Sequence, residues 1–213
     1  MAFVKHNVAC YIDKKMQPTD SAICAIRSTG IAHNIPVISD EVAAFLCVQL
    51  ALVKPRNILE IGTAIGYSGA LLLTQSAAHL TTIELNPANY KMAEQHFADL
   101  QLSGRTTMLL GDAAEQLEAL PQNHYQFIFI DAAKGHYLDY FKKCDKLLQT
   151  GGLIIADNVL HKGYVAGEPH PRRQRTIIQR MNQFIDYVCK QPNYTSSLLS
   201  LGDGVLMAVK RTI

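Results

Sequence analysis

The sequence predicts an α/β fold: a doubly wound, mostly parallel seven-stranded sheet that ends in an antiparallel C-terminal hairpin. Two patterns lead to this prediction. Between residues 57 and 156, short apolar runs alternate with amphipathic segments, a rhythm typical of a parallel sheet with helices on both faces. After residue 172 the rhythm stops, and two strand-like segments follow a helix with only Gly-Asp-Gly between them. Strands joined so tightly pair antiparallel.

The expected elements follow one another with short connections. Residues 1–35 are mixed in composition and are predicted to be helical, forming a lid or a dimer contact. A helix then begins after Ser39, whose hydroxyl suits an N-cap, with Asp40 and Glu41 in its first turn. The expected strands are 57–61, 80–85, 106–110, 125–130, 153–156, 194–201 and 205–209. The expected helices among them are 68–76, 88–100, 113–119, 137–148 and 172–189.

Composition bounds the class of protein. With 213 residues, 48% of them hydrophobic and 18% charged, the chain can bury one core, and we expect a single domain over residues 1–213. The net charge of +2 neither requires nor excludes a polyanionic partner. Five scattered cysteines without a C-x-x-C pair argue against zinc and disulfides and favour the reducing cytoplasm. Neither a signal-peptide pattern nor about 18 consecutive apolar residues occurs, so no membrane association is expected.

The segment from residue 58 to residue 73, ILEIGTAIGYSGALLL, carries the first chemical pattern. Gly62 and Gly66 fall in the turn between a strand and a helix, where missing side chains let a ligand approach backbone N–H groups. Glu84 ends the next strand, at about the distance downstream where an acid binds ribose hydroxyls. These residues favour a nucleoside ligand over a tight turn with only a packing role, although the dinucleotide fingerprint G-x-G-x-x-G is absent.

A third strand end carries Asp112 and Ala113, at the place where the edge of an adenine ring would be met. Asp112 fits equally well as the N-cap of the helix that follows it. Spacing alone leaves both interpretations open.

Two apolar strands end in acids at what should be the same edge of the sheet. Residues 125–130 run into Asp131, and residues 153–156 run into Asp157 and Asn158. Ligands of open α/β sheets bind at the carboxyl ends of the strands, so these side chains are expected to lie together. Their oxygens suit Mg²⁺, whereas zinc would favour cysteine or histidine. The alternatives are a helix cap, a surface loop and a turn.

Lys134, three residues after Asp131, is the candidate base. A free lysine has a pKa near ~10.4, but partial burial and a neighbouring divalent cation disfavour its charged form. The same cation makes a bound hydroxyl more acidic. The alternative is a solvated lysine that pairs with Asp131.

The ordered motifs EIGTAIGYS, Glu84, GDA, DAAKGHY, ADN and GDG resemble the metal-dependent, S-adenosylmethionine-dependent O-methyltransferases that include catechol and caffeoyl-CoA methyltransferases. The similarity extends from about residue 35 to the end of the chain. It implies the Rossmann-like class I methyltransferase fold, methyl transfer to oxygen, and a homodimer.

The resemblance also implies a role for each site residue. The residues that would bind S-adenosylmethionine are Ile38, Gly62, Ser68, Glu84, Asp112, Ala113 and Asp131. Asp131, Asp157 and Asn158 would hold Mg²⁺ or Mn²⁺, and Lys134 would take the proton from the hydroxyl being methylated. Such a metal chelates two vicinal oxygens and holds one in line with the methyl group.

Within this family, DNVLHKGYVAGE, PRRQR and PNYTSSLLSLGDGV most resemble the bacterial enzymes that convert 5-hydroxyuridine to 5-methoxyuridine at the tRNA wobble position. The 5-hydroxyl and 4-carbonyl of that base are vicinal oxygens. Basic side chains that could meet phosphates of the tRNA anticodon loop are Lys162, Arg172, Arg173, Arg175 and Arg180. A small catechol-like or caffeoyl-CoA-like substrate is an equally weighted alternative. A third class, an NAD-dependent dehydrogenase or a silent nucleotide-binding module, would leave Lys134 and Asp157 without a role.

Overall fold

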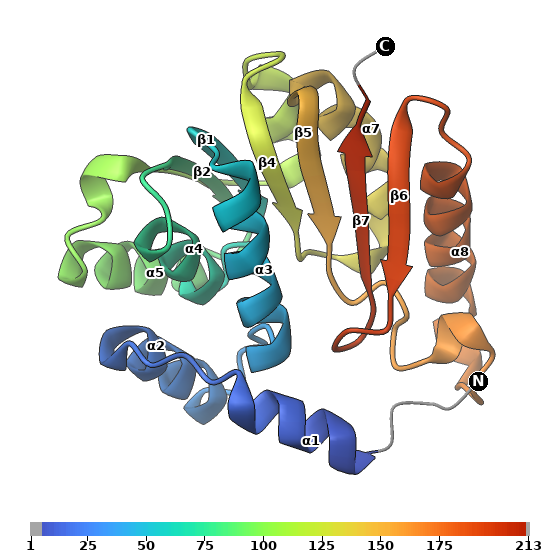
Figure 1. Cartoon of the computed structure of the whole chain (residues 1–213), viewed down its shortest axis with the longest axis horizontal. Helices are drawn as coiled ribbons and strands as arrows, with labels where there is room; N and C mark the ends of the chain where they lie inside the picture. Colours follow the sequence, from blue (N-terminus) through green and yellow to red (C-terminus); the bar gives the residue numbers. More distant parts are fainter. Residues whose placement is uncertain (1–5, 212–213) are drawn as a thin grey trace.

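The computed structural model describes residues 6–211, and its centre is a seven-stranded sheet (Figure 1). The strand order is β3-β2-β1-β4-β5-β7-β6; the first five pair in parallel, and β7 pairs antiparallel with β5 and β6. The strands are β1 (Asn57–Ile61), β2 (His79–Glu84), β3 (Thr106–Leu110), β4 (Tyr125–Ile130), β5 (Leu148–Ala156), β6 (Tyr194–Leu199) and β7 (Val205–Lys210). The predicted fold class is therefore confirmed.

Within the described residues, three helices precede β1, and the others lie in the connections between strands. The α-helices are α1 (His6–Lys15), α2 (Ser21–Ala32), α3 (Asp40–Val53), α4 (Tyr67–Thr74), α5 (Pro87–Asp99), α6 (Ala113–Gln116), α7 (Tyr137–Leu147) and α8 (Arg175–Cys189). Short 3₁₀ turns are η1 (Ser103–Arg105), η2 (Leu117–Ala119), η3 (Lys134–His136), η4 (Tyr164–Ala166) and η5 (Arg172–Gln174). Across the described residues, no helix is both long enough and apolar enough to cross a membrane.

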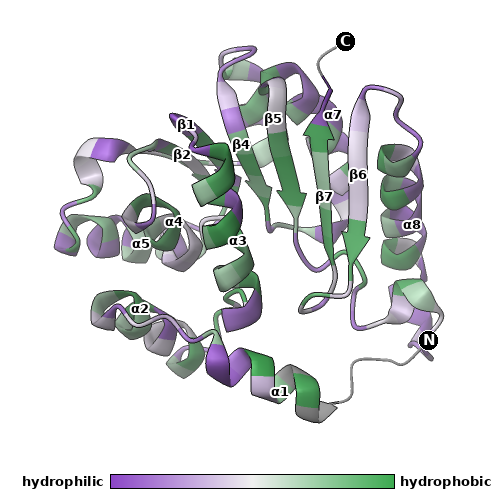
Figure 2. Cartoon of the chain, in the orientation of Figure 1, coloured by the Kyte–Doolittle hydropathy of each residue, from purple (hydrophilic) through white to green (hydrophobic). Residues whose placement is uncertain are grey.

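The sheet is buried on both faces because neighbouring residues of its central strands point to opposite sides. Phe127 and Phe129 of β4 join a core beneath α2, α3, α4 and α5. Ile128 and Ile130 join a second core beneath α7 and α8. In Figure 1, α3 crosses one face of the sheet and α7 lies behind the other. Figure 2 shows β7 and the C-terminal halves of β4 and β5 as strongly hydrophobic, and the edge strand β6 as nearly neutral over most of its length.

A relay of backbone hydrogen bonds aligns the strand ends that carry the predicted site. The N–H of Gly62 donates to Ile83 O at 3.0 Å, and the N–H of Asp131 donates to Ile61 O at 2.9 Å. The N–H of Asp157 donates to Ile130 O at 2.9 Å. The residues that follow β1, β4 and β5 therefore emerge side by side from one edge of the sheet.

Several element boundaries differ from those predicted. β5 begins at Leu148 instead of residue 153, because Leu148 pairs with Tyr125 before the register of β4 and β5 shifts. The predicted helix 113–119 is an α-helical turn followed by the 3₁₀ turn η2. The 3₁₀ turn η5 likewise precedes α8 within the predicted helix 172–189.

The described part of the N-terminal segment is helical, as predicted, and consists of α1 and α2. Asp20 caps α2 by accepting hydrogen bonds from the N–H groups of Ala22 and Ile23. Ile23 and Ile26 of α2 are buried in the core, while Tyr11 of α1 is exposed. The role of this segment as a lid or dimer contact stays a prediction, and its first five residues lie outside the described part.

Candidate active site

A cavity of about 690 Å³ opens at the carboxyl ends of β1, β2, β3 and β4. Nine of the ten predicted site residues are in its lining: Ile38, Gly62, Ser68, Glu84, Asp112, Ala113, Asp131, Lys134 and Asn158. The tenth, Asp157, is not in the lining and has only 1% of its surface exposed. Residues up to 120 positions apart in the sequence thus share one wall. Most of them follow strand ends at one edge of the sheet, whereas Ile38 precedes α3 and Ser68 lies in α4.

The turn between β1 and α4 brings backbone to this cavity, and two of its residues must be glycine. Gly62 has a φ of +98°, and a Cβ at this position would lie 1.9 Å from the backbone oxygen of Asp131. Gly66, with a φ of +84°, begins α4 and is packed against Ala93 and Phe97. Any side chain at Gly62 would separate β1 from the end of β4, so glycine is required here for backbone packing, whereas the sequence analysis predicted it for the approach of a ligand.

Glu84 lies at the end of β2, on the cavity wall, and 9% of its surface is exposed. One carboxylate oxygen accepts from the N–H of Ala64 at 2.7 Å, and the other accepts from the N–H of Asn86 at 2.8 Å. Each oxygen has a second acceptor position. The side chain is therefore fixed in place and can still accept hydrogen bonds from hydroxyl groups of a ligand.

Asp112 reconciles the two interpretations that its spacing left open. Asp112 is the N-cap of α6, because its carboxylate accepts a hydrogen bond of 2.7 Å from the N–H of Ala114. Asp112 and Ala113 also line the cavity. The same residue thus begins a helix and faces the ligand space.

A buried acid that the sequence analysis did not assign to the site lies beneath the cavity wall. Glu60 of β1 is fully buried and accepts hydrogen bonds from Ser68 Oγ at 2.5 Å and Thr82 Oγ1 at 2.6 Å. Burial raises the pKa of Glu60 to about 7, against the lowering effect of these hydrogen bonds. Glu60 thereby fixes the orientation of Ser68. The sequence does contain a signal for this role, because Glu60 is the one acid inside the apolar strand ILEI and precedes Ser68 by eight residues.

The two predicted metal-binding acids form a charge-coupled pair. Burial raises the pKa of Asp131 to about 6, with the charge of Lys134 as an opposing effect. Burial also raises the pKa of Asp157 to about 7, and the charge of Asp131 adds to that rise. Asn158 follows in a left-handed conformation with a φ of +56°, and its N–H donates to Asp157 Oδ1 at 2.6 Å.

Tyr137, from the motif DAAKGHY, links the two strand ends behind these acids. Its buried hydroxyl donates to the backbone oxygen of Asp157 at 3.1 Å and accepts from the N–H of Ala132 at 3.2 Å. The sequence placed Tyr137 in a motif without assigning its hydroxyl a partner. The structure shows that this hydroxyl joins the residue after Asp131 to Asp157.

The ion pair of Lys134 is with a residue that the sequence interpretation did not connect to it. Lys134 Nζ lies 3.9 Å from Asp203 Oδ2, in the turn between β6 and β7. The alternative of an ion pair between Lys134 and Asp131 is thus not what forms, although the charge of Lys134 does reach Asp131. Only the folded chain brings residues 134 and 203 together.

The donor set for a metal is two carboxylates and one amide. Within residues 6–211, no group of three or more histidine, cysteine, aspartate or glutamate side chains could hold a metal ion. Asp131 and Asp157 are two side chains of these types, and the third predicted ligand, Asn158, is an amide and so falls outside them. A set of three oxygens without sulfur or imidazole suits a hard cation better than zinc.

A cavity with a glycine turn, an acid at the end of β2 and an acid pair beside a lysine is typical of one class: nucleoside-binding proteins built on a doubly wound sheet. Comparison with known proteins narrows this class. A family model described as O-methyltransferase matches residues 23–211. The chain belongs to this O-methyltransferase family, and it is a methyltransferase.

Individual relatives agree with this assignment. A protein named as an O-methyltransferase in Mycobacterium tuberculosis is 33% identical over 187 residues, which cover 86% of this chain and 81% of the relative. A solved structure named as a caffeoyl-CoA O-methyltransferase from Staphylococcus aureus is 32% identical, with a TM-score of 0.88, and the match covers 95% of this chain and 98% of that one.

A second solved structure is an O-methyltransferase from Bacillus cereus in complex with SAH. It is 28% identical, with a TM-score of 0.83, over 96% of this chain and 97% of that one. Of the three classes weighed from the sequence, the family selects the methyltransferase over the dehydrogenase and the silent binding module.

Proposed function

We propose that this enzyme transfers a methyl group from S-adenosylmethionine to a hydroxyl that has a vicinal oxygen, with the help of a divalent cation. The observation that carries this proposal is that Asp131, Lys134 and Asn158 line one cavity while Asp157, charge-coupled to Asp131, is buried next to Asn158. A nucleoside cofactor alone would not require this arrangement.

The walls of the cavity support a binding site for S-adenosylmethionine. Glu84 offers its two free acceptor positions to the ribose hydroxyls, and Asp112 with Ala113 lies where the adenine would be met. Gly62 contributes backbone to the cavity wall, and Ser68 contributes a hydroxyl that Glu60 already orients. The Bacillus cereus relative in complex with SAH supports the same ligand class for this chain.

The acid pair fits a divalent cation on structural grounds. Burial disfavours the ionised form of both acids, the charge of Asp131 adds to this effect at Asp157, and a bound cation would offset both charges. The Asp131 carboxylate accepts no hydrogen bond from any described residue, and Asp157 accepts one, from the N–H of Asn158. Their open acceptor positions would be filled by Mg²⁺ or Mn²⁺ together with the Asn158 amide oxygen.

The chain's own groups would then do the following work. A bound divalent cation would supply Lewis acidity, which lowers the pKa of a chelated hydroxyl. Lys134 Nζ would take the proton that the hydroxyl loses. The cavity walls would hold cofactor and acceptor in line, so that the oxygen attacks the methyl carbon as the carbon–sulfur bond breaks. Tyr137 would keep the backbone on either side of the acid pair in register.

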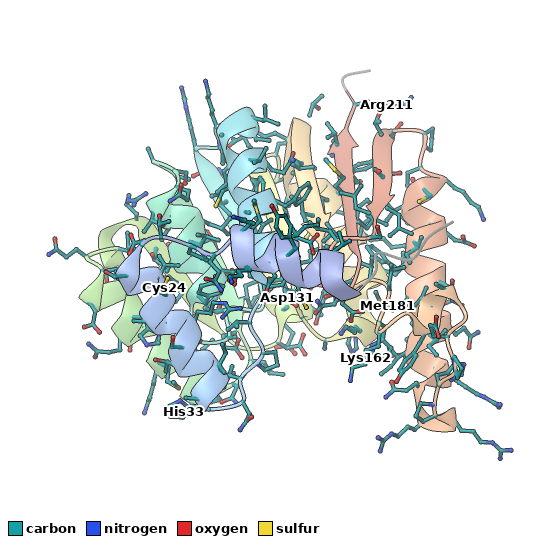
Figure 3. All side chains as sticks on the ribbon, turned by 60° about the horizontal axis from the view of Figure 1, so that its bottom comes forward. Cys24, His33, Asp131, Lys162, Met181 and Arg211 are labelled. Carbon is teal, nitrogen blue, oxygen red and sulfur yellow. The ribbon has the colours of Figure 1, made fainter. Side chains whose placement is uncertain are left out.

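We propose the wobble 5-hydroxyuridine of tRNA as the acceptor. Exposed basic residues support this proposal: η5 begins with Arg172 and Arg173, and Arg180 of α8 donates at 3.3 Å to the backbone oxygen of Gly135, which lines the cavity. Lys162 (Figure 3) follows His161, whose Nε2 lies 2.8 Å from Oε1 of Gln174, the residue before α8. Ile177 of α8 lines the cavity itself. A small catechol or a caffeoyl-CoA-like compound is the second candidate, favoured by the name of the Staphylococcus aureus relative.

The test is methyl transfer from labelled S-adenosylmethionine to two acceptors: a simple catechol, and tRNA that carries 5-hydroxyuridine. Each reaction is run with Mg²⁺ and with EDTA, and the tRNA reaction is repeated over a range of salt. We expect labelling of the tRNA that EDTA abolishes and that salt weakens steeply, because phosphate contacts release counterions.

Each other result has a definite meaning. Labelling of the catechol alone would reject the tRNA acceptor and retain the metal mechanism. Labelling that survives EDTA would reject the role of the metal. As a matched variant, Arg172→Gln should weaken labelling of tRNA and leave labelling of a catechol unchanged.

A further inference from the structure

The turn between β6 and β7 is fastened to three other parts of the molecule. The N–H of Gly202 donates to Glu41 Oε2 of α3 at 3.1 Å. Gly204 has a φ of +87°, and a Cβ there would lie 2.3 Å from the side chain of Leu160. A hairpin turn with no role beyond joining two strands would not need such close packing at its tip.

The strongest of these attachments is to the loop that follows Asn158. The N–H of Leu160 donates to the backbone oxygen of Asp203 at 3.0 Å, and the N–H of Val159 donates to Gly204 O at 2.9 Å. The N–H of Lys162 donates to Asp203 Oδ1. Asp203 therefore holds the loop 159–162 with its backbone and with one oxygen of its side chain.

The other carboxylate oxygen faces the candidate base. Asp203 Oδ2 lies 3.9 Å from Lys134 Nζ, and both side chains are partly exposed, at 29% and 25%. The charge of Asp203 also reaches Asp157. One carboxylate thus contacts, through its two oxygens, the loop that follows β5 and the lysine that follows the neighbouring strand β4.

We propose that Asp203 is a positioning residue for methyl transfer, which fixes Lys134 Nζ relative to the loop 159–162. This inference rests on the proposed function, because it takes Lys134 as the base. Asp203 lies outside the cavity lining and acts through Lys134 instead of touching the acceptor. Loss of the ion pair leaves Lys134 free to adopt other rotamers, and a misplaced base slows proton transfer.

Asp203→Asn and Asp203→Ala separate the contact of Asp203 with Lys134 from its contact with the N–H of Lys162. Asp203→Asn keeps an oxygen for the N–H of Lys162 and removes the charge that faces Lys134. Asp203→Ala removes both. Asp203→Glu restores the charge on a longer side chain. The control is Asp186→Asn, because Asp186 also pairs with a lysine, Lys190 at 3.4 Å, but lies exposed on α8.

Steady-state kinetics test the half that involves Lys134. Asp203→Asn should lower kcat by about 10- to 100-fold with KM for the acceptor unchanged. Asp203→Glu should recover part of this loss, and Asp186→Asn should match the wild type. In a Lys134→Ala background, Asp203→Asn should cause no further loss of kcat. A wild-type kcat in Asp203→Asn, or an equal loss in both backgrounds, would overturn the proposal.

Two further measurements test the position of Lys134 and of the loop 159–162 without measuring methyl transfer. Exchange of the Lys162 amide hydrogen, followed by NMR, should accelerate in Asp203→Ala but not in Asp203→Asn. A crystal structure of Asp203→Asn should show Lys134 turned away from residue 203. Unchanged exchange in Asp203→Ala, or an unmoved Lys134, would overturn the proposal. If the wild type methylates neither acceptor, the proposed function fails, and these two measurements still decide whether Asp203 positions Lys134.

Discussion

Ser68 Oγ donates a hydrogen bond of 2.5 Å to Oε1 of Glu60, a carboxyl group with no exposed surface. Glu60 Oε2 accepts a second hydrogen bond, from Thr82 Oγ1, which in turn lies 2.5 Å from Thr63 Oγ1. This buried chain of side chains ties β1, β2 and α4 together directly beneath the cavity. The cavity wall at Ser68 is therefore held by a network and not only by packing.

Replacing Ser68 by alanine should destabilise the enzyme. The substitution leaves Glu60 Oε1 buried without its donor, and an unsatisfied buried polar group costs about 1–3 kcal/mol. Urea unfolding at pH 7 measures this cost. Ser28→Ala is the control, because Ser28 donates to Cys24 O on an exposed part of α2 and should cost under about 0.5 kcal/mol. Equal losses in the two variants would contradict the prediction.

Glu60 should make stability depend on pH. Its pKa rises from 4.5 in the unfolded chain to about 7 in the fold, so between these values the folded state binds the proton more tightly. The contribution of protonated Glu60 to the free energy of unfolding is therefore fully present below pH 4.5 and is lost as the pH rises through 7. The shift corresponds to roughly 3 kcal/mol.

Unfolding of Glu60→Gln by urea at a series of pH values tests this dependence. Glutamine does not titrate, so the fall in stability between pH 4.5 and 7 should be smaller in Glu60→Gln than in the wild type. Glu94→Gln, on the exposed side of α5, should follow the wild-type curve. Parallel curves for Glu60→Gln and wild type would show that Glu60 does not titrate in this range.

Gly62→Ala should be the most damaging single change at the site. The added Cβ would lie 1.9 Å from Asp131 O, and the positive φ is unfavourable for alanine. We expect a loss of more than about 3 kcal/mol in stability, together with weaker binding of S-adenosylmethionine. Thermal unfolding and calorimetric titration measure both quantities. Gly104→Ala is the matched control, since a Cβ there has no neighbour within 4 Å.

Tyr137→Phe removes one hydroxyl and leaves the aromatic packing against Phe184 in place. The N–H of Ala132 and the backbone oxygen of Asp157 then each lose a partner, at a cost of about 1–2 kcal/mol. Because these two groups adjoin Asp131 and Asp157, binding of Mn²⁺, followed by electron paramagnetic resonance, should also weaken. Tyr11→Phe, on the exposed surface of α1, should change neither quantity. Unaltered Mn²⁺ binding in Tyr137→Phe would separate the tyrosine from the acid pair.

Local signals in the sequence determined the sheet, its hairpin and seven residues of the cavity wall: apolar runs set the strands, glycines mark the turn after β1, and parallel strands must end at a common edge. Ile38 and Ser68 were assigned to the site only through the resemblance to a known family. Asp131, Lys134 and Asn158 could be assigned to that edge because each follows the end of a strand within a few residues.

Only the tertiary structure decided which side chains meet across that edge. Lys134 pairs with Asp203 and not with Asp131, because the antiparallel hairpin folds its turn back onto the loop after β5. Ser68 contacts Glu60 because α4 returns over β1, and Tyr137 reaches Asp157 because α7 begins beside the end of β5. Such contacts depend on the packing of distant segments and on side-chain directions within a few ångströms. A linear pattern of residue types specifies neither.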